Sequence, residues 1–281
     1  MTAVSLPVPF TTKGVAGLAA LLARPRAALV GLDFDGTLAP IVPDPDQARP
    51  HPAAGAALRG LAPKIGTVAV LTGRPPELAA AMLGLDAGPA PDNLVIAGHY
   101  GLQTWTPSGG VVPYAGAVSG DVEAVRRAIP GLLAAVAAPD GTTVEDKGAA
   151  IAVHVRRTAD PSAAMALLRE PLSALANESG LRLEQGRMVL ELRPDGVDKG
   201  IALESLAADR HAEVVCFIGD DLGDLAAFAA IERLRDTGLS GLAICSGSDE
   251  VPELMAAADL VVDGPDGVVA FLAELTVALG E

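Results

Sequence analysis

The sequence has few cysteines, few lysines and no long apolar segment. The 281 residues include two cysteines, Cys216 and Cys245, and both stand in apolar runs. We therefore expect two buried thiols, and neither a disulfide nor a cysteine-based metal site. No apolar stretch approaches the roughly 20 residues of a transmembrane helix. We expect a cytoplasmic protein that does not bind a membrane.

Positive charge is also scarce. The formal net charge is −15 and the sequence pI is near 4.6, so a nucleic-acid partner is not expected. An anionic substrate would need a local cationic pocket that works against the overall field. Half of the residues are hydrophobic, which is enough for a sizeable core, and the length allows two domains. We expect a monomer that acts on a small molecule.

One stretch stands out against this background. Residues 27–34 form an apolar run, typical of a buried parallel strand, and the run ends in Asp33 and Asp35 followed by Gly36. Ligands of open α/β sheets bind just beyond the carboxyl ends of the strands. A strand end with an Asx-turn is the ordinary explanation of a lone D-x-D. The longer pattern D-x-D-G-T-L is more specific and favours catalysis.

The order of elements predicts an α/β fold, with a Rossmann-like parallel-sheet core and an inserted α+β domain. Strands alternate with helices up to about residue 100 and again from residue 199 to the end. Between them, the pattern is a helix, two strands at 143–146 and 149–156, a helix at 161–178, and two further strands. We assign residues 1–114 and 194–281 to the core and residues 115–193 to the inserted domain.

Several core strands are predicted to end in polar clusters. Thr72 and Arg74 follow a strand at 67–71, Asp220 and Asp224 follow a strand at 214–218, and Lys199 begins a helix. A parallel sheet brings such ends together at one edge. Several carboxylates in one place repel each other unless a hard cation is present, and oxygen ligands select Mg²⁺.

This set of residues can perform phosphoryl transfer. Asp33 would be the nucleophile and Asp35 the acid and base, while Thr72 would hold a phosphoryl oxygen and Lys199 would offset negative charge. Asp220 and Asp224 would hold the magnesium ion. Taken singly, Thr72 could be a strand-end hydroxyl, Lys199 a solvated helix residue and Asp224 a helix N-cap. Their joint occurrence in this order favours catalysis.

These residues resemble the four motifs of the haloacid dehalogenase superfamily of phosphotransferases. The matching segments are D-F-D-G-T-L at 33–38, Thr72 in L-T-G-R, Lys199, and G-D-D-x-x-D at 219–224. The aspartate two residues after the nucleophile resembles the phosphatases of that superfamily. An α/β cap inserted between the second and third motifs is similar to the sugar-phosphatase branch.

The resemblance extends to the trehalose-6-phosphate phosphatase family. It rests on L-T-G-R at 71–74, V-E-D-K at 144–147 with H-V-R at 154–156, and E-L-R-P at 191–194 before D-K-G at 198–200. It implies that the metal is held by Asp33, Asp220 and the backbone carbonyl of Asp35. It also implies that cap residues grip the disaccharide. The candidate substrate-binding residues are Arg74, His99, Lys147, Arg156, Glu191 and Arg193.

The chain departs from that family's usual pattern at a few places. Gly98-His99-Tyr100-Gly101 replaces G-x-H-G, Gln103 stands where a glutamate is usual, and Gly223 and Leu225 replace a threonine and a glutamate. The resemblance implies a phosphoric monoester hydrolase that uses Mg²⁺ to convert trehalose 6-phosphate to trehalose and phosphate. The departures leave two alternatives, a phosphatase of another sugar phosphate, such as sucrose phosphate or glucosylglycerol phosphate, and a non-catalytic sugar-phosphate sensor.

Overall fold

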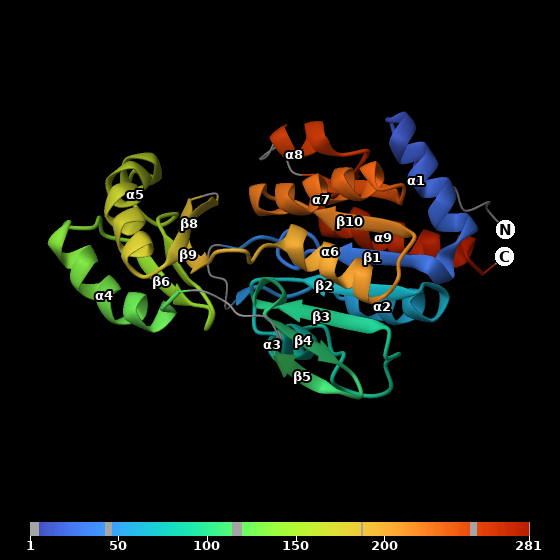
Figure 1. Cartoon of the computed structure of the whole chain (residues 1–281), viewed down its shortest axis with the longest axis horizontal. Coiled ribbons are helices and arrows are strands. Elements are labelled where there is room, and N and C mark those ends of the chain that lie inside the picture. Colours follow the sequence, from blue (N-terminus) through green and yellow to red (C-terminus); the bar gives the residue numbers. More distant parts are fainter. Residues whose placement is uncertain (1–5, 43–46, 114–119, 187, 248–251, 281) are drawn as a thin grey trace. The chain divides into compact units, whose positions relative to one another are not determined.

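The chain forms two compact units. A computed structural model describes residues 6–42, 47–113, 120–186, 188–247 and 252–280. Unit 1 comprises residues 1–113 and 198–281, and unit 2 comprises residues 114–197 (Figure 1). The sequence predicts boundaries at 114/115 and 193/194, whereas unit 2 extends four residues further at the second boundary, to residue 197. The first boundary falls outside the described residues.

Unit 1 is built on an eight-stranded sheet with the order β12-β11-β10-β1-β2-β3-β4-β5 (Figure 1). The six strands from β12 to β3 run parallel, and β4 and β5 add an antiparallel hairpin. The strands are β1 (Ala28–Leu32), β2 (Thr67–Leu71), β3 (Leu94–Gly98), β4 (Gln103–Thr106), β5 (Gly110–Pro113), β10 (Val214–Gly219), β11 (Ser240–Gly247) and β12 (Leu260–Asp263).

Helices cover both faces of this sheet. The α-helices of unit 1 are α1 (Thr12–Ala23), α2 (Ala54–Leu61), α3 (Pro76–Met82), α6 (Lys199–Asp209), α7 (Leu225–Asp236), α8 (Pro252–Ala257) and α9 (Gly264–Ala278). Short 3-10 turns include η4 (His99–Gly101) and η5 (Leu222–Asp224). Side chains from α1, α2, α3 and α9 pack on one face, and those from α6, α7 and α8 pack on the other.

The strands are apolar on both faces because helices cover both faces of the sheet. In β1, Val30 and Leu32 join one core cluster while Leu29 joins the other, because successive side chains point to opposite faces. All five residues of β1 are buried. Cys216 and Cys245 are buried free thiols, as expected. The α/β fold class is confirmed.

Unit 2 is a smaller α+β body. Its four-stranded antiparallel sheet has the order β6-β7-β9-β8, and one apolar cluster joins the sheet to α4 and α5. The elements are α4 (Val122–Ala135), β6 (Thr143–Asp146), β7 (Ile151–His154), α5 (Pro161–Glu178), β8 (Leu181–Gly186) and β9 (Val189–Pro194). One expectation was wrong: Arg156 was placed on a strand, but β7 ends at His154 and Arg156 lies in the following turn.

Within the described residues, no helix combines the length and the apolar character needed to cross a membrane.

Candidate active site

The carboxyl ends of the central strands of unit 1 carry the acidic cluster. Parallel pairing places Leu32 of β1 opposite Ile218 of β10 and Val70 of β2. Asp33 continues this register, since its backbone N–H donates to the carbonyl of Ile218 at 2.8 Å. Asp220 directly follows β10. Both aspartates are therefore held by the backbone of adjacent central strands.

Lys199 connects two of the carboxylates. Its Nζ lies 2.6 Å from Asp33 Oδ1 and 2.7 Å from Asp224 Oδ1, and all three side chains are nearly inaccessible to solvent. The lysine is the first residue of α6, which is capped by Asp198 through a 2.8 Å hydrogen bond from the N–H of Ile201. The ammonium is thus fixed between two anions rather than solvated, which was the alternative considered from the sequence.

Asp224 uses both carboxylate oxygens within the protein. Oδ1 accepts from Lys199, and Oδ2 accepts from the backbone N–H groups of Asp220 and Asp221 at 2.9 and 3.2 Å. Together with Asp221 it forms a capping box at η5. Asp221 is the N-cap of that box and Asp224 is its third residue, and Asp224 makes no side-chain cap hydrogen bond to α7, so the N-cap explanation does not account for it. The side chain orients the lysine and the turn that carries Asp220.

Asp220 lies against the turn after β1. Thr37 Oγ1 donates to Asp220 Oδ1 at 3.3 Å. Gly36 has a φ of 84°, and a Cβ there would lie 1.8 Å from Asp220 Oδ2, so only glycine fits. Ser246, at the end of β11, donates from Oγ to the carbonyl of Gly36 at 2.9 Å. Thr37 and Ser246 are not among the site residues predicted from the sequence; the serine that closes the apolar run of β11 was the available signal.

The cluster has more negative than positive charge. Oxygens of Asp33, Asp220 and Asp224 lie within 4.8 Å of one another. Burial raises the pKa of Asp33 to about 8 even though Lys199 opposes the shift, and nearby Asp224 adds to it. Burial and the charge of Asp33 raise the pKa of Asp220 well above its ordinary range. Burial acts to lower the pKa of Lys199, but the charges of Asp224 and Asp33 raise it well above its ordinary value.

Such a site suits a hard divalent cation. Three buried carboxylates face one ammonium, and the donors are oxygen atoms, which fit Mg²⁺ better than softer metals. Because both oxygens of Asp224 are engaged by N–H donors, Asp33 and Asp220 are the better-suited carboxylate ligands.

Arg74 pairs with Asp35. Its Nε and Nη2 donate to the two oxygens of the Asp35 carboxylate at 2.8 and 2.7 Å, and its guanidinium stacks 5.2 Å from the ring centre of Phe34. The Asp35 side chain is 45% exposed, in contrast to the nearly buried Asp33. Arg74 was expected to contact substrate; here the bidentate pair fixes the orientation of Asp35.

Backbone hydrogen bonds join residues 72–74 to the segment that follows β3. Thr72 Oγ1 accepts from the N–H of Arg74 at 3.1 Å, which leaves the hydroxyl proton able to donate. The N–H groups of His99 and Tyr100 donate to the carbonyls of Arg74 and Thr72 at 3.1 and 2.9 Å. His99 and Tyr100 have φ values of 49° and 57°, a left-handed conformation that costs a non-glycine residue about 1–3 kcal/mol.

Three of the candidate substrate residues of unit 2 take part in ion pairs at its sheet. Lys147 Nζ lies 2.6 Å from Glu191 Oε2, and both side chains are largely buried. Arg193 Nη2 donates to Glu184 Oε2 at 3.2 Å. Arg156 is half-buried and has no hydrogen-bond or ion-pair partner within the part of the chain that the structure describes.

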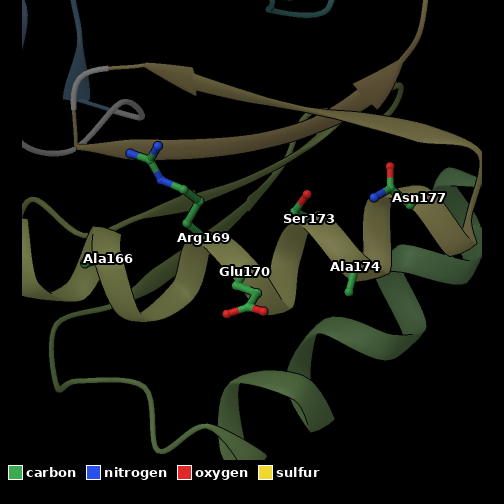
Figure 2. A pocket seen from close by; sticks show the side chains of 6 residues that line it. All are labelled: Ala166, Arg169, Glu170, Ser173, Ala174 and Asn177. Carbon is green, nitrogen blue, oxygen red and sulfur yellow. The ribbon is translucent and has the colours of Figure 1, made fainter.

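Unit 2 also has a shallow pocket along α5. Figure 2 shows its lining, which comes from one face of that helix: Ala166, Arg169, Glu170, Ser173, Ala174 and Asn177. No candidate site residue lines it, so the pocket is separate from the Lys147–Glu191 pair.

Comparison with known proteins identifies relatives along most of the chain. The family model described as trehalose-phosphatase matches residues 31–264. The trehalose-phosphate phosphatase of Mycobacterium marinum is 34% identical over 267 residues, which cover 90% of this chain and 62% of the relative. The trehalose-6-phosphate phosphatase of Escherichia coli is 30% identical over 207 residues, which cover 72% of this chain and 73% of the relative.

A third relative is much longer. An uncharacterised glycosyl hydrolase of Mycobacterium tuberculosis is 34% identical over 264 residues, which cover 91% of this chain but 19% of the relative. The chain thus spans about a fifth of that protein and less than two thirds of the Mycobacterium marinum enzyme.

Solved structures share the fold. A trehalose-6-phosphate phosphatase related protein is 25% identical with a TM-score of 0.67, covering 89% of this chain and 97% of that one. A haloacid dehalogenase-like hydrolase from Bacteroides thetaiotaomicron is similar in fold alone, at 17% identity and a TM-score of 0.55, covering 88% and 98% of the two chains. On its sequence match from residue 31 to residue 264, the chain belongs to the trehalose-phosphatase family.

Proposed function

We propose that the protein hydrolyses trehalose 6-phosphate to trehalose and phosphate through a phosphorylated Asp33. The observation that carries the proposal is the buried contact of Lys199 with Asp33 beside Asp220, in a chain of the trehalose-phosphatase family. A strand-end carboxylate held next to an ammonium is suited to attack phosphorus. The expected cellular setting remains the cytoplasm, with the protein as a monomer.

In the first step, an oxygen of Asp33 bonds to phosphorus while the bond from phosphorus to the sugar oxygen breaks. Asp35 gives a proton to that departing oxygen, and trehalose leaves. In the second step, Asp35 takes a proton from water, the water oxygen bonds to phosphorus, and the bond to Asp33 breaks to release phosphate. Thr72 donates to a phosphoryl oxygen, and Lys199 offsets the charge that develops on the phosphoryl group.

The carboxylates of Asp33 and Asp220, with the backbone carbonyl of Asp35, would hold the magnesium ion. A bound Mg²⁺ supplies charge neutralisation next to the phosphoryl oxygens. Asp224 keeps Lys199 and the Asp220 turn in place, and its role is one of positioning. Thr37 donates to Asp220, and Ser246 supports the Gly36 turn that lies against Asp220.

Unit 2 is proposed to act as the cap that recognises the sugar. The Lys147–Glu191 pair offers both donors and an acceptor, and Arg156 adds a further donor with no partner among the described residues. Sugar hydroxyls can exchange hydrogen bonds with all three side chains. Arg193 supports this face through its contact with Glu184, and His99 is a further candidate from unit 1.

Phosphate release from a panel of sugar phosphates tests the proposal. Trehalose 6-phosphate is expected to be the best substrate, with Mg²⁺ required. Better turnover of sucrose phosphate or glucosylglycerol phosphate would assign the second candidate function, which Tyr100 and Gln103 motivate. Binding without any turnover would indicate a sensor.

A further inference from the structure

Tyr100 has a backbone conformation that tyrosine rarely adopts. Its φ and ψ are 57° and 34°, and His99 before it is also left-handed. Two such residues in succession persist only where neighbouring structure enforces them, and such positions gather at functional sites. Here the N–H of Tyr100 is bonded to the carbonyl of Thr72 at 2.9 Å. The strained segment is thus anchored to the residue proposed to hold a phosphoryl oxygen.

The segment also packs closely against α6. Gly101 has a φ of 96°, and a Cβ at this position would lie 2.8 Å from the Cβ of Ala202. Ala202 lies one turn after Lys199 on the same helix. Tyr100 is therefore held between the strand end that carries Thr72 and the helix that begins with Lys199.

This backbone directs the phenol across Gly73. A Cβ at Gly73 would lie 2.7 Å from the Tyr100 hydroxyl oxygen and 2.8 Å from Cζ. The hydroxyl is thus next to the Thr72-Gly73 turn. Thr72 is 1% exposed and Lys199 is 6% exposed, whereas Tyr100 is only half-buried. The phenol consequently lies at the rim of the site, and the phosphate-binding groups lie at its base.

We propose that Tyr100 is a specificity-determining residue whose hydroxyl hydrogen-bonds the sugar next to the phosphate. The inference rests on the proposed function of the Asp33 site. A phosphate held by Thr72 and Lys199 has its leaving group directed away from the base, toward the rim where the phenol lies. A phenol hydroxyl both donates and accepts, which suits a sugar hydroxyl or ether oxygen.

The substitution Tyr100→Phe tests this inference because the ring that covers Gly73 is retained. For the sugar phosphate that the wild type hydrolyses best, kcat/KM is expected to fall about tenfold, mainly through KM, as for loss of one substrate hydrogen bond. For p-nitrophenyl phosphate, which has no sugar, kcat/KM is expected to change less than about twofold. Thr104→Val, which removes a hydroxyl from neighbouring β4, is the matched control and should change neither value.

Product inhibition gives an independent measurement. In Tyr100→Phe, inhibition by the free sugar product is expected to weaken about tenfold, while inhibition by inorganic phosphate is unchanged. An equal loss for both substrates, or equal effects on both inhibitors, would show that Tyr100 acts on the phosphate and would overturn the proposal, as would no change at all. Wild-type activity on the sugar-phosphate panel judges the proposed function separately, because it does not depend on the variant.

Discussion

The two units differ in how they hold their charged residues. In unit 1, Lys199, Asp33 and Asp224 are almost completely buried and are joined to one another and to the backbone of the turn after β10. In unit 2, Lys147 and Glu191 pair on one small sheet, and Lys147 keeps 18% of its side-chain surface exposed. A buried network with fixed geometry suits bond-making chemistry, whereas an ion pair with a partly exposed lysine can exchange partners with a ligand. We therefore expect substitutions in the two units to lower activity to different extents and for different substrates.

The largest effect is expected in unit 1. Asp33→Asn keeps the shape of the side chain but removes the nucleophile, so kcat should fall by about 10³-fold or more for every phosphate ester. Phosphate release measures this, and Asp209→Asn at the exposed end of α6 is the control. If Asp33→Asn retained wild-type hydrolysis, the phosphoenzyme mechanism would be wrong.

A smaller and substrate-dependent effect is expected in unit 2. Glu191→Gln breaks the ion pair with Lys147, so kcat/KM for the sugar phosphate should fall about 10–100-fold through lost sugar contacts. Hydrolysis of p-nitrophenyl phosphate should stay nearly unchanged. Glu123→Gln, which changes an exposed side chain of α4, serves as the control. Equal losses for both substrates would remove the distinction between the two units.

Stability should depend on pH through unit 1. The pKa of Asp33 is raised from 3.8 to about 8 in the folded protein, and that of Asp220 is also raised. The folded state binds these protons more tightly than the unfolded state does. The contribution of these groups to stability is therefore complete below pH 4 and is lost as pH rises toward 8.

Thermal unfolding of the metal-free protein measures this dependence. The Tm should fall by roughly 5 °C across that window, and added Mg²⁺ should restore it, most strongly at the higher pH. Asp220→Asn should flatten the profile. A metal-free Tm that rises over the same range would contradict the origin assigned to these shifts.

The smallest effect is expected at Ser246. Ser246→Ala removes the hydrogen bond to the carbonyl of Gly36, so stability should fall by about 1 kcal/mol and kcat by a few-fold. Urea unfolding and phosphate release measure the two quantities. Ser240→Ala, which loses only an exposed contact with Arg24, is the matched control. Identical behaviour of the two variants would show that the Gly36 turn does not need this support.

Much of the fold was predictable from local pattern. β2, β6 and α5 have the predicted bounds, because apolar runs, the turn at Gly148 and an Asp-Pro helix start are all local signals. The meeting of Asp33 with Asp220 was also predictable, since parallel strands end at one edge. Arg156 was misplaced because the strand pattern continues two residues beyond the last paired residue, His154.

The pairings within the site were less accessible. That Arg74 binds Asp35, and that Asp224 serves Lys199, depends on side-chain directions set by elements far apart in the chain. The support of Gly36 by Ser246 spans 210 positions. The left-handed backbone of Tyr100 has no local signal either, because tyrosine is not a residue that favours it. Composition and spacing identify groups with reactive chemistry but do not show which neighbour each one contacts.

The end of unit 2 at residue 197 has a practical consequence for chimeric proteins. Asp198 caps α6 and Lys199 is the first residue of that helix, so the lysine follows the inserted segment almost without a spacer. A graft that exchanges the insert between relatives must therefore join before Asp198. A junction one or two positions later would exchange the helix cap or the lysine as well, and a change in turnover would no longer report on the insert alone.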